Sequence, residues 1–306
     1  MTAPTSQAVL SASVPPRAGR GWGPLRLLLR LVRDPAVCIA IVLLLVIALC
    51  AISAPLIAPY HPNDISPFST LKGPSSAHLL GTDENGRDVL SRVIYGSRVS
   101  LTVGFISVGI ALLVGVPLGL ISGYAGRWAD SLIMRTMDAI LAFPALILAL
   151  AIVAMLGQGI NQLMIAIGVT SIPVFARLVR AQTLSLKTLD FAVAARSMGA
   201  PARRILARHI LPNTLAPIIV QASLGMAFAI LAEAGLSFLG VGIRPPTATW
   251  GGMLQKALRS TQRAPSLSIF PGIAIFLTVL ALNLVGDGLR DVLDPRLRGR
   301  LQDGRR

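Results

Sequence analysis

The chain has 306 residues, of which 54% are hydrophobic and 13% charged, and its mean hydropathy is +0.71. These values exclude an ordinary soluble globular domain and are typical of a protein that crosses a membrane several times. The net charge of +15 does not indicate a nucleic-acid partner, because aromatic residues make up only 5% of the chain and the arginines stand between apolar runs. Membrane orientation explains the basic charge better.

The first 35 residues form the first predicted unit, a cytoplasmic tail followed by a short helix. Residues 1–21 are rich in Ser, Ala and Pro, which predicts disorder. Residues 22–33 place three arginines on one helical face among leucines, a pattern typical of a helix lying in the membrane interface. The uncharged run at 35–60 is longer than the roughly 7–15-residue core of a cleaved signal peptide, so we interpret it as the first membrane span.

Charge-poor runs predict an all-α, polytopic membrane protein with six transmembrane helices. The run at 139–176 is too long for one span of about 20 residues. The polar segment at 157–162 divides it into a hairpin of two spans. The six predicted spans lie roughly at 37–58, 99–122, 139–157, 161–181, 213–239 and 268–288.

The distribution of Lys and Arg predicts that both termini are cytoplasmic. With the N-terminus inside, 20 of the 28 Lys and Arg residues fall in cytoplasmic segments and 8 fall outside. The cytoplasmic segments of membrane proteins carry such an excess. The eight outer residues are Lys72, Arg87, Arg92, Arg98, Arg244, Lys256, Arg259 and Arg263.

The first outer loop ends in a patterned stretch at residues 78–101. Thr82 or Asp83 can cap a helix there, and the apolar residues that follow form one face of it. Asp88 and Arg92 have the i,i+4 spacing of an ion pair. From the residues alone we expect an amphipathic helix that rests on the outer surface.

The longest polar interruption in the second half of the chain lies at 189–213 and predicts two short helices. Asp190 can cap the first, which would stop at Gly199, and Pro201 suits the first turn of the second, which would end before Pro212. Helices this short are marginal alone, since about 12–15 residues are needed. Either the membrane domain or a partner must hold them, and the alanines and glycine leave a face that another protein could approach closely.

This loop resembles the cytoplasmic loop of permease subunits in bacterial ATP-binding-cassette (ABC) importers. The loop of that family has Glu-Ala-Ala, three residues, Gly, nine residues, Ile, one residue and Leu-Pro. Val193 stands here in place of the Glu and His209 in place of the Ile, and His-Ile-Leu-Pro-Asn is similar to the peptide and nickel branch. The alternative is an ordinary basic loop between two spans. The resemblance assigns coupling to an ATPase to Ala194, Ala195, Gly199, His209, Leu211 and Pro212.

Three further stretches resemble the second permease of dipeptide and oligopeptide importers. They are the Gly-Thr-Asp, Gly-Arg-Asp, Ser-Arg string at 81–92, the outer segment at 236–251 and the C-terminal segment at 283–295. The resemblance therefore covers about residues 35–300 and implies a type I ABC importer permease fold. The expected units are residues 1–35, residues 36–98 with the first span and the extracytoplasmic loop, residues 99–290 as the transmembrane core, and residues 291–306 as a cytoplasmic tail.

The resemblance also implies a function, partners and a location. With a second permease, as a heterodimer, the chain would form the path for di- and oligopeptides or related small peptides such as glutathione. Two cytoplasmic ATP-binding subunits would drive transport, an extracytoplasmic substrate-binding protein would deliver the substrate, and membrane lipid would surround the spans. The location would be the bacterial inner (plasma) membrane. Nickel is the alternative substrate within the family, and a stand-alone secondary transporter is the alternative from a different class.

The motifs of nucleotide binding and catalysis do not occur in the chain. It lacks the Gly-x-x-x-x-Gly-Lys-Ser/Thr loop that cradles phosphates, so ATP would be bound by the partner subunits and we expect no cofactor. Neither a metalloprotease His-Glu-x-x-His motif nor a Gly-x-Ser-x-Gly nucleophile motif is present, so we expect no enzyme. His61, His78 and His209 are isolated, and we expect no metal site.

Glu233 is the one acidic residue deep in a predicted span, where a charge is costly and must face a cavity or a partner. One interpretation places it on the translocation path, near the ammonium group of a peptide. The other makes it structural, bonded to backbone or to an arginine at the subunit interface. Asp138 follows Arg135 by three residues near the inner end of the third span, and we expect the two to pair.

Overall fold

The computed structural model describes residues 34–260 and 262–293, and its regular structure there is helical apart from one isolated bridge between Thr82 and Asp88. The five longest helices are α2 (Pro35–Ile52), α4 (Val89–Ala125), α7 (Ile160–Leu186), α10 (Leu211–Phe238) and α12 (Ser266–Leu293). The shorter elements are α3 (Ala54–Ile57), η1 (Pro67–Ser69), α5 (Arg127–Leu141), α6 (Ala145–Leu156), α8 (Asp190–Ser197), α9 (Ala202–Ile205), the π-helix η2 (Leu206–Ile210) and α11 (Trp250–Ala257). The tail expected at 1–21, the interfacial helix expected at 22–33 and the chain from residue 294 onward lie outside the described residues.

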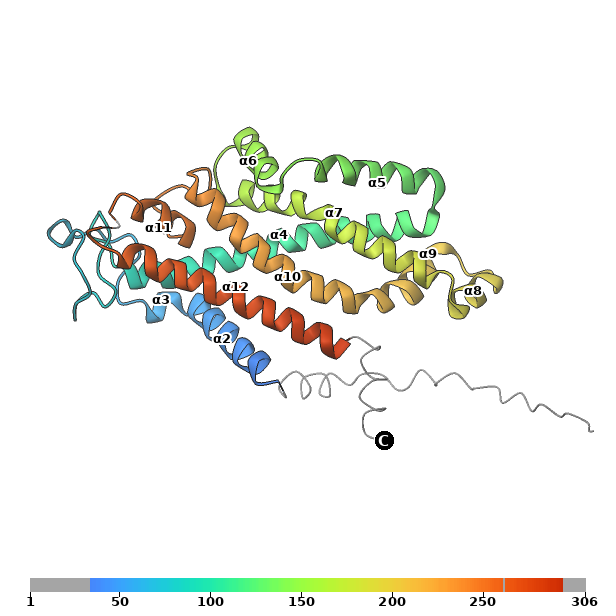
Figure 1. Cartoon of the computed structure of the whole chain (residues 1–306), viewed down its shortest axis with the longest axis horizontal. Coiled ribbons are helices and arrows are strands. Elements are labelled where there is room, and N and C mark those ends of the chain that lie inside the picture. Colours follow the sequence, from blue (N-terminus) through green and yellow to red (C-terminus); the bar gives the residue numbers. More distant parts are fainter. Residues whose placement is uncertain (1–33, 261, 294–306) are drawn as a thin grey trace, which may run out of the picture.

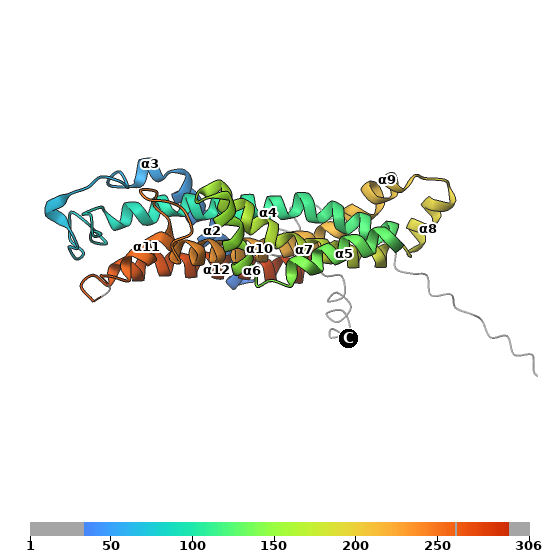
Figure 2. The same cartoon turned by 90° about the horizontal axis from the view of Figure 1, so that it is seen from above.

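The long helices run side by side along the longest dimension of the molecule (Figures 1 and 2). At one end lie α11, α3 and the loop that joins α3 to α4, whereas α8 and α9 lie at the opposite end (Figure 1). The bent pair α5 and α6 lies along one side, beside α7 (Figure 1). The loop regions around α11 and around α8 therefore lie at opposite ends of the helical bundle.

Among the described residues, five helices are long and apolar enough to cross a membrane, and the bent pair of α5 and α6 makes a sixth span when it is counted as one. The five are α2, α4, α7, the helix Ala202–Phe238 and α12. Both α4 and the helix Ala202–Phe238 contain 37 residues, which corresponds to about 55 Å at 1.5 Å per residue. Since the apolar core of a bilayer is about 30 Å thick, these two helices extend well beyond it.

The third span differs from the straight helix that the sequence predicts at 139–157. The structure divides it into α5 and α6, which are bent by 90° across a short break. The break falls at Pro144, which has no backbone N–H to donate and disfavours a helical backbone at Phe143 before it. Only the 12 residues of α6 belong to the apolar part of this span.

Charged side chains bind α5 to its neighbours. Asp130 accepts hydrogen bonds from the guanidinium group of Arg180 on α7, at 2.5 and 2.6 Å, and one from Ser122 on α4. Asp138 pairs with Arg177 on α7, so the local pair expected with Arg135 is wrong. The sequence could not show this partner, because the fold brings α5 and α7 together across a 39-residue separation.

The outer loop also differs from the expectation of a separate surface helix. The helix begins at Val89, with Asp88 as its N-cap, and continues without a break into the second span. The carboxylate of Asp88 accepts hydrogen bonds from the backbone N–H and the hydroxyl of Ser91 and lies 3.0 Å from Nδ1 of His78. The expected pair between Asp88 and Arg92 is therefore wrong, because the cap and the histidine occupy the carboxylate.

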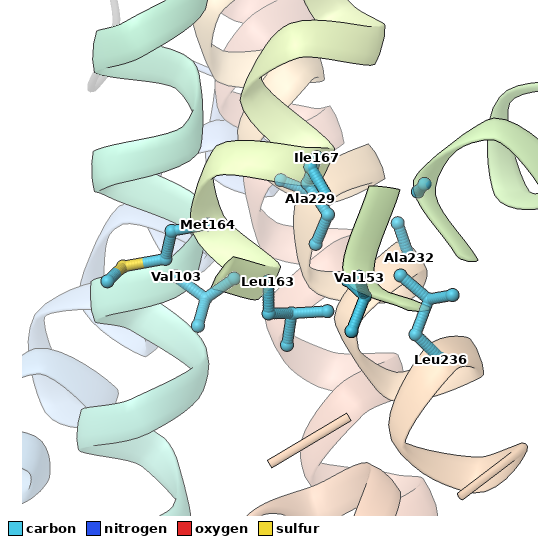
Figure 3. Close-up of a cluster of buried hydrophobic side chains, with 10 residues drawn as sticks. Val103, Val153, Leu163, Met164, Ile167, Ala229, Ala232 and Leu236 are labelled. Carbon is cyan, nitrogen blue, oxygen red and sulfur yellow. The ribbon is translucent and has the colours of Figure 1, made fainter. Parts of the chain in front are cut away.

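Apolar side chains from four spans form the interior at the level of α6. Val103 of α4, Val153 of α6, Leu163 of α7 and Leu236 of α10 all belong to one buried cluster (Figure 3). Complete burial of such side chains contributes about 1.5–3 kcal/mol each when water is the reference. The short helix α6 is thus held by packing against its neighbours.

The closest packing in the bundle lies between α4 and α7. Three glycines of α4 at i,i+4 spacing, Gly115, Gly119 and Gly123, face the backbone of α7. A Cβ atom on Gly119 would lie 2.5 Å from the carbonyl oxygen of Ala176, well inside van der Waals contact. Small residues at this spacing let two helices approach closely where lipid offers no hydrophobic driving force.

We predict that Gly119→Ala destabilises the protein, because the new methyl group would press on the backbone of α7 and overpacking costs about 1–3 kcal/mol. The matched control is Gly109→Ala on the same helix, where a Cβ meets no atom within 4 Å and a helical Gly→Ala change is neutral or stabilising. The measurement is the melting temperature of each purified variant. Equal melting temperatures for the two variants would contradict the tight α4–α7 contact.

Candidate functional site

The loop at 189–213 forms a helical corner at the end of the bundle opposite α11 (Figure 1). Leu189 occupies the N-cap position of α8, and Asp190, which was expected there, is the first helical residue. Gly199 has φ of +78°, the left-handed conformation that suits glycine after a helix, so the predicted turn is present. Pro201 then precedes α9, and the two short helices exist as predicted.

The end of the second helix differs from the expectation. It does not stop before Pro212, because the π-helix η2 carries it directly into α10, and Ala202–Phe238 forms one continuous helix. Pro212 lies directly after this π-helical turn, whose i→i+5 pattern already interrupts the α-helical hydrogen bonds where the N–H of the proline is missing. The side chain of Asn213 donates to the backbone oxygen of His209 at 2.6 Å, which supports the junction. The loop is therefore joined rigidly to a membrane span.

The membrane domain of the same chain holds the corner in place. Ala195, Ile205 and Ile210 are buried and pack together against the C-terminal ends of α4 and α7. The guanidinium carbon of Arg196 lies 5.5 Å from the centre of the Tyr124 ring on α4, within the range of a cation–π contact. The membrane domain of the same chain thus provides the contacts that hold these short helices.

The other face of the corner exposes apolar side chains. Met198 is 81% exposed, and Leu189, Phe191 and Val193 are also exposed. No atom lies within 4 Å of the position that a Cβ atom on Gly199 would take, so the space beside this glycine is open. Sequence reasoning missed this apolar surface, although the residues stand among the alanines that it did single out. An exposed apolar patch at a protein end is typical of an interaction site.

The structure places the six sequence-assigned loop residues on both sides of the corner. Ala195 is buried beneath the corner, and His209 and Leu211 are partly exposed at the η2–α10 junction. Ala194, Gly199 and Pro212 are exposed. The motif therefore divides into one residue that packs inward and others that are open to contact.

Glu233 lies far from this corner, in the C-terminal half of α10, and its side chain is fully buried. Its carboxylate accepts hydrogen bonds from the hydroxyls of Ser100 on α4, at 3.2 Å, and Ser237 on α10, at 2.9 Å. Neither the backbone nor the arginine that one sequence interpretation expected is among the hydrogen-bond partners given by the described residues. Whether this residue lines a translocation path remains a prediction.

No group of three or more His, Cys, Asp or Glu side chains in residues 34–260 and 262–293 is arranged to hold a metal ion. His78 contacts Asp88, and His61 lies 3.7 Å from Asp64 on the exposed outer loop. His209 stacks near Phe191, with ring centroids 6.4 Å apart. Each histidine thus has its contacts in a different part of the structure.

Comparison with known proteins places this architecture in a family. Residues 115–299 match the model of the binding-protein-dependent transport system inner membrane component, and residues 25–74 match the N-terminal transmembrane domain of oligopeptide transport permease C. The dipeptide transport system permease protein DppC of Alkalihalophilus pseudofirmus is 49% identical over 85% of this chain and 86% of its own length. The glutathione transport system permease protein GsiD of Pectobacterium atrosepticum is 48% identical over 86% of this chain and 87% of its own length.

A third relative agrees with these two. The di/tripeptide transport system permease protein DppC of Pseudomonas aeruginosa is 48% identical over 83% of this chain and 86% of its own length. The matches cover the spans, the helical corner and the outer loop, which together confirm the resemblance that the sequence motifs indicated. The chain therefore belongs to the family of inner membrane components of binding-protein-dependent transport systems, and it is a transport component rather than an enzyme.

Proposed function

We propose that this chain is a permease subunit of an ABC importer that forms, with a second permease, a path for di- or oligopeptides or related small peptides such as glutathione. Two cytoplasmic ATPase subunits bind and hydrolyse ATP, and an extracytoplasmic binding protein delivers the substrate to the opposite face. The relatives named above are permeases for dipeptides, di/tripeptides and glutathione, which favours peptides over nickel.

The observation that carries this proposal is the helical corner with its exposed apolar face. Leu189, Phe191, Val193 and Met198 present apolar surface that an ATPase groove can cover. Behind that surface, Ile205 and Ile210 rest on α4 and α7, and η2 continues into α10. A displacement of α8 by the ATPase therefore reaches three spans through packed side chains and an unbroken helix.

The stand-alone secondary transporter gains no support from the site. Such proteins bind substrate and coupling ions at broken helices near mid-membrane. The broken pair here, α5 and α6, carries its charges on α5, where Asp130 and Asp138 pair with Arg180 and Arg177. These charges hold helices together and leave no carboxylate there for a coupling ion.

We propose that Glu233 affects the translocation path indirectly, by positioning the two helices that it joins. Its two hydrogen bonds connect α4 and α10, so it sets the spacing of two spans that would border the path. A carboxylate fully buried among hydroxyls suits this positioning role, since a direct substrate contact would need an opening to the side chain.

We predict that Gly199→Asp leaves the chain inserted in the membrane but impairs ATPase docking and abolishes uptake. A side chain at this φ of +78° costs roughly 1 kcal/mol and would project into the proposed docking surface. The measurements are co-purification of the ATPase subunits and uptake of a labelled dipeptide, glutathione and Ni²⁺.

The matched control for this test is Gly126→Asp, at the junction of α4 and α5. Gly126 has φ of +63° and ψ of −163°, a conformation at least as restrictive for a side chain as that of Gly199, with open space around a Cβ position, and it lies outside the corner. The control should retain docking and uptake. Wild-type docking and uptake in Gly199→Asp would make the corner an ordinary connector, and uptake of Ni²⁺ alone by the wild type would exclude peptides as the substrate.

We predict that Glu233→Gln is tolerated better than Glu233→Leu. Glutamine can still hydrogen-bond with Ser100 and Ser237, whereas leucine leaves two buried hydroxyls unpaired at a cost of about 1–3 kcal/mol each. Melting temperature and peptide uptake measured on both variants test this. Full stability combined with loss of uptake in Glu233→Gln would show that the charge itself is required.

We also propose that both chain termini are cytoplasmic, with α8 and α9 on the cytoplasmic side and α11 outside. A reporter enzyme that is active only outside the cytoplasm should be inactive when fused after Arg306 and active when inserted after Arg244, between α10 and α11. The reverse pattern would invert the topology, and activity at both sites would overturn the count of six spans.

A further inference from the structure

The outer end of the molecule contains a charged cavity that the proposed function does not use. It has a volume of about 280 Å³ and lies between the loop that precedes α4 and the helix α11. Its charged lining residues are Asp83, Glu84, Arg87, Arg92, Lys256 and Arg259. Four of these come from the Gly-Thr-Asp, Gly-Arg-Asp, Ser-Arg string that the sequence analysis singled out, so the fold gathers that motif around one cavity.

The carboxylates of the cavity are already occupied. Asp83 accepts hydrogen bonds from the backbone N–H groups of Asn85 and Arg87 and from Nε of Arg87 at 2.9 Å. The same carboxylate lies 3.7 Å from Nε of Arg92. Glu84 accepts a hydrogen bond from the hydroxyl of Ser260 at 2.8 Å. The acidic groups thus fix the two buried arginines and the loop in place.

Two cations remain available to a ligand. Within residues 34–260 and 262–293, neither the Lys256 ammonium group nor the Arg259 guanidinium group forms an ion pair or hydrogen bond, and both line the cavity. Lys256 is half-buried and Arg259 is exposed. Four basic and two acidic side chains leave an excess of two positive charges, which raises the local concentration of anions.

The environment of Lys256 agrees with this excess. Burial lowers the pKa of its ammonium group below the ordinary value, and the charges of Arg87 and Arg92 lower it further. Asp83 and Glu84 act in the opposite direction but do not reverse the shift. The ammonium group therefore lies in a positive electrostatic potential, which a bound anion would lower.

The volume of the cavity and its other lining residues indicate which class of anion would fit. The volume of about 280 Å³ is several times the roughly 30 Å³ that one water molecule occupies, so the cavity is larger than a single small ion needs. Met253 and Leu267 supply apolar side chains to the same lining. Asp83 and Glu84 disfavour a compact multiply charged anion such as phosphate.

We propose that this cavity binds a small solute that carries one carboxylate on an apolar stem, the class to which the C-terminal end of a peptide belongs. Lys256 and Arg259 contact the carboxylate at the mouth, the buried arginines supply the field behind it, and Met253 and Leu267 contact the stem. The proposal rests on the proposed function for the orientation that exposes this end to extracytoplasmic solutes.

The chain itself supplies a reporter for this site. It contains three lysines, Lys72, Lys187 and Lys256, and only Lys256 lines the cavity. A lowered pKa gives Lys256 a larger fraction of the reactive neutral amine, and a bound carboxylate reverses that effect and blocks access. Acylation by an amine-reactive reagent, quantified for each lysine by mass spectrometry, therefore measures occupancy, and Lys72 on the same outer face serves as the internal reference.

The experiment uses the assembled transporter in lipid nanodiscs without the binding protein. The probes are N-acetyl-alanyl-alanine, its C-terminal amide and inorganic phosphate. We expect the free acid to protect Lys256 at millimolar concentration, with no protection from the amide or from phosphate and no change at Lys72. Equal protection by acid and amide, or protection by phosphate alone, would overturn the carboxylate assignment, and no protection by any probe would overturn the site.

Two variants sharpen the test. Arg259→Gln should raise the concentration needed for half-protection about three- to fivefold, because one partly exposed charge on the carboxylate is lost. Arg263→Gln makes the same change at an exposed residue outside the cavity and should leave it unaltered. Equal effects of both variants would show that general surface charge, and not a specific site, causes the protection. Since the readout needs neither ATP nor uptake, it should persist in Gly199→Asp, so its failure and the failure of the proposed function can be told apart.

Discussion

The close approach of α4 and α7 is the constraint on which the rest of the structure depends. Gly115, Gly119 and Gly123 remove side chains along one line of α4, and the backbone of α7 occupies the space. In a lipid environment such contact replaces the hydrophobic effect as the source of helix association. At one end both helices pack against the helical corner, and at the other end they contact α6 and α11.

The two ends of the bundle have different surfaces, one apolar and one charged, and the same long helices connect them. The end with α8 and α9 exposes apolar side chains on a corner that rests on α4 and α7, whereas the end with α11 has a cavity with excess positive charge. The helix α10 connects them, since it begins at the corner, carries Glu233 in its C-terminal half and packs against α11. Near α11 the indole N–H of Trp250, the first residue of that helix, donates to the backbone oxygen of Val93 at 2.9 Å. The helix α10 and these contacts therefore connect the two ends of the bundle directly.

Much of this architecture could be predicted from local patterns. Apolar runs located the spans because a bilayer demands about 20 apolar residues for each crossing, whatever the helix packs against. The glycine after α8 and the proline before α9 located the corner, since both act on their own backbone. The charge partners could not be found in this way. Asp88, Arg92 and Asp138 were all expected to pair within one or two turns of the same helix, and each has a different partner in the fold.

By itself, the sequence determined the all-helical membrane class, the positions of the apolar spans and the motif that marks the corner, because hydropathy and backbone preference are properties of short segments. Only the tertiary structure decided that Pro144 breaks the third span by 90°, that η2 fuses the corner to α10, and that Glu233 bonds to two serines. It alone also brought residues 83–92 and 253–267 together around one cavity. These features depend on which segments meet in space, and the energy of a buried charge or a bent helix is set by neighbours that lie far away along the chain.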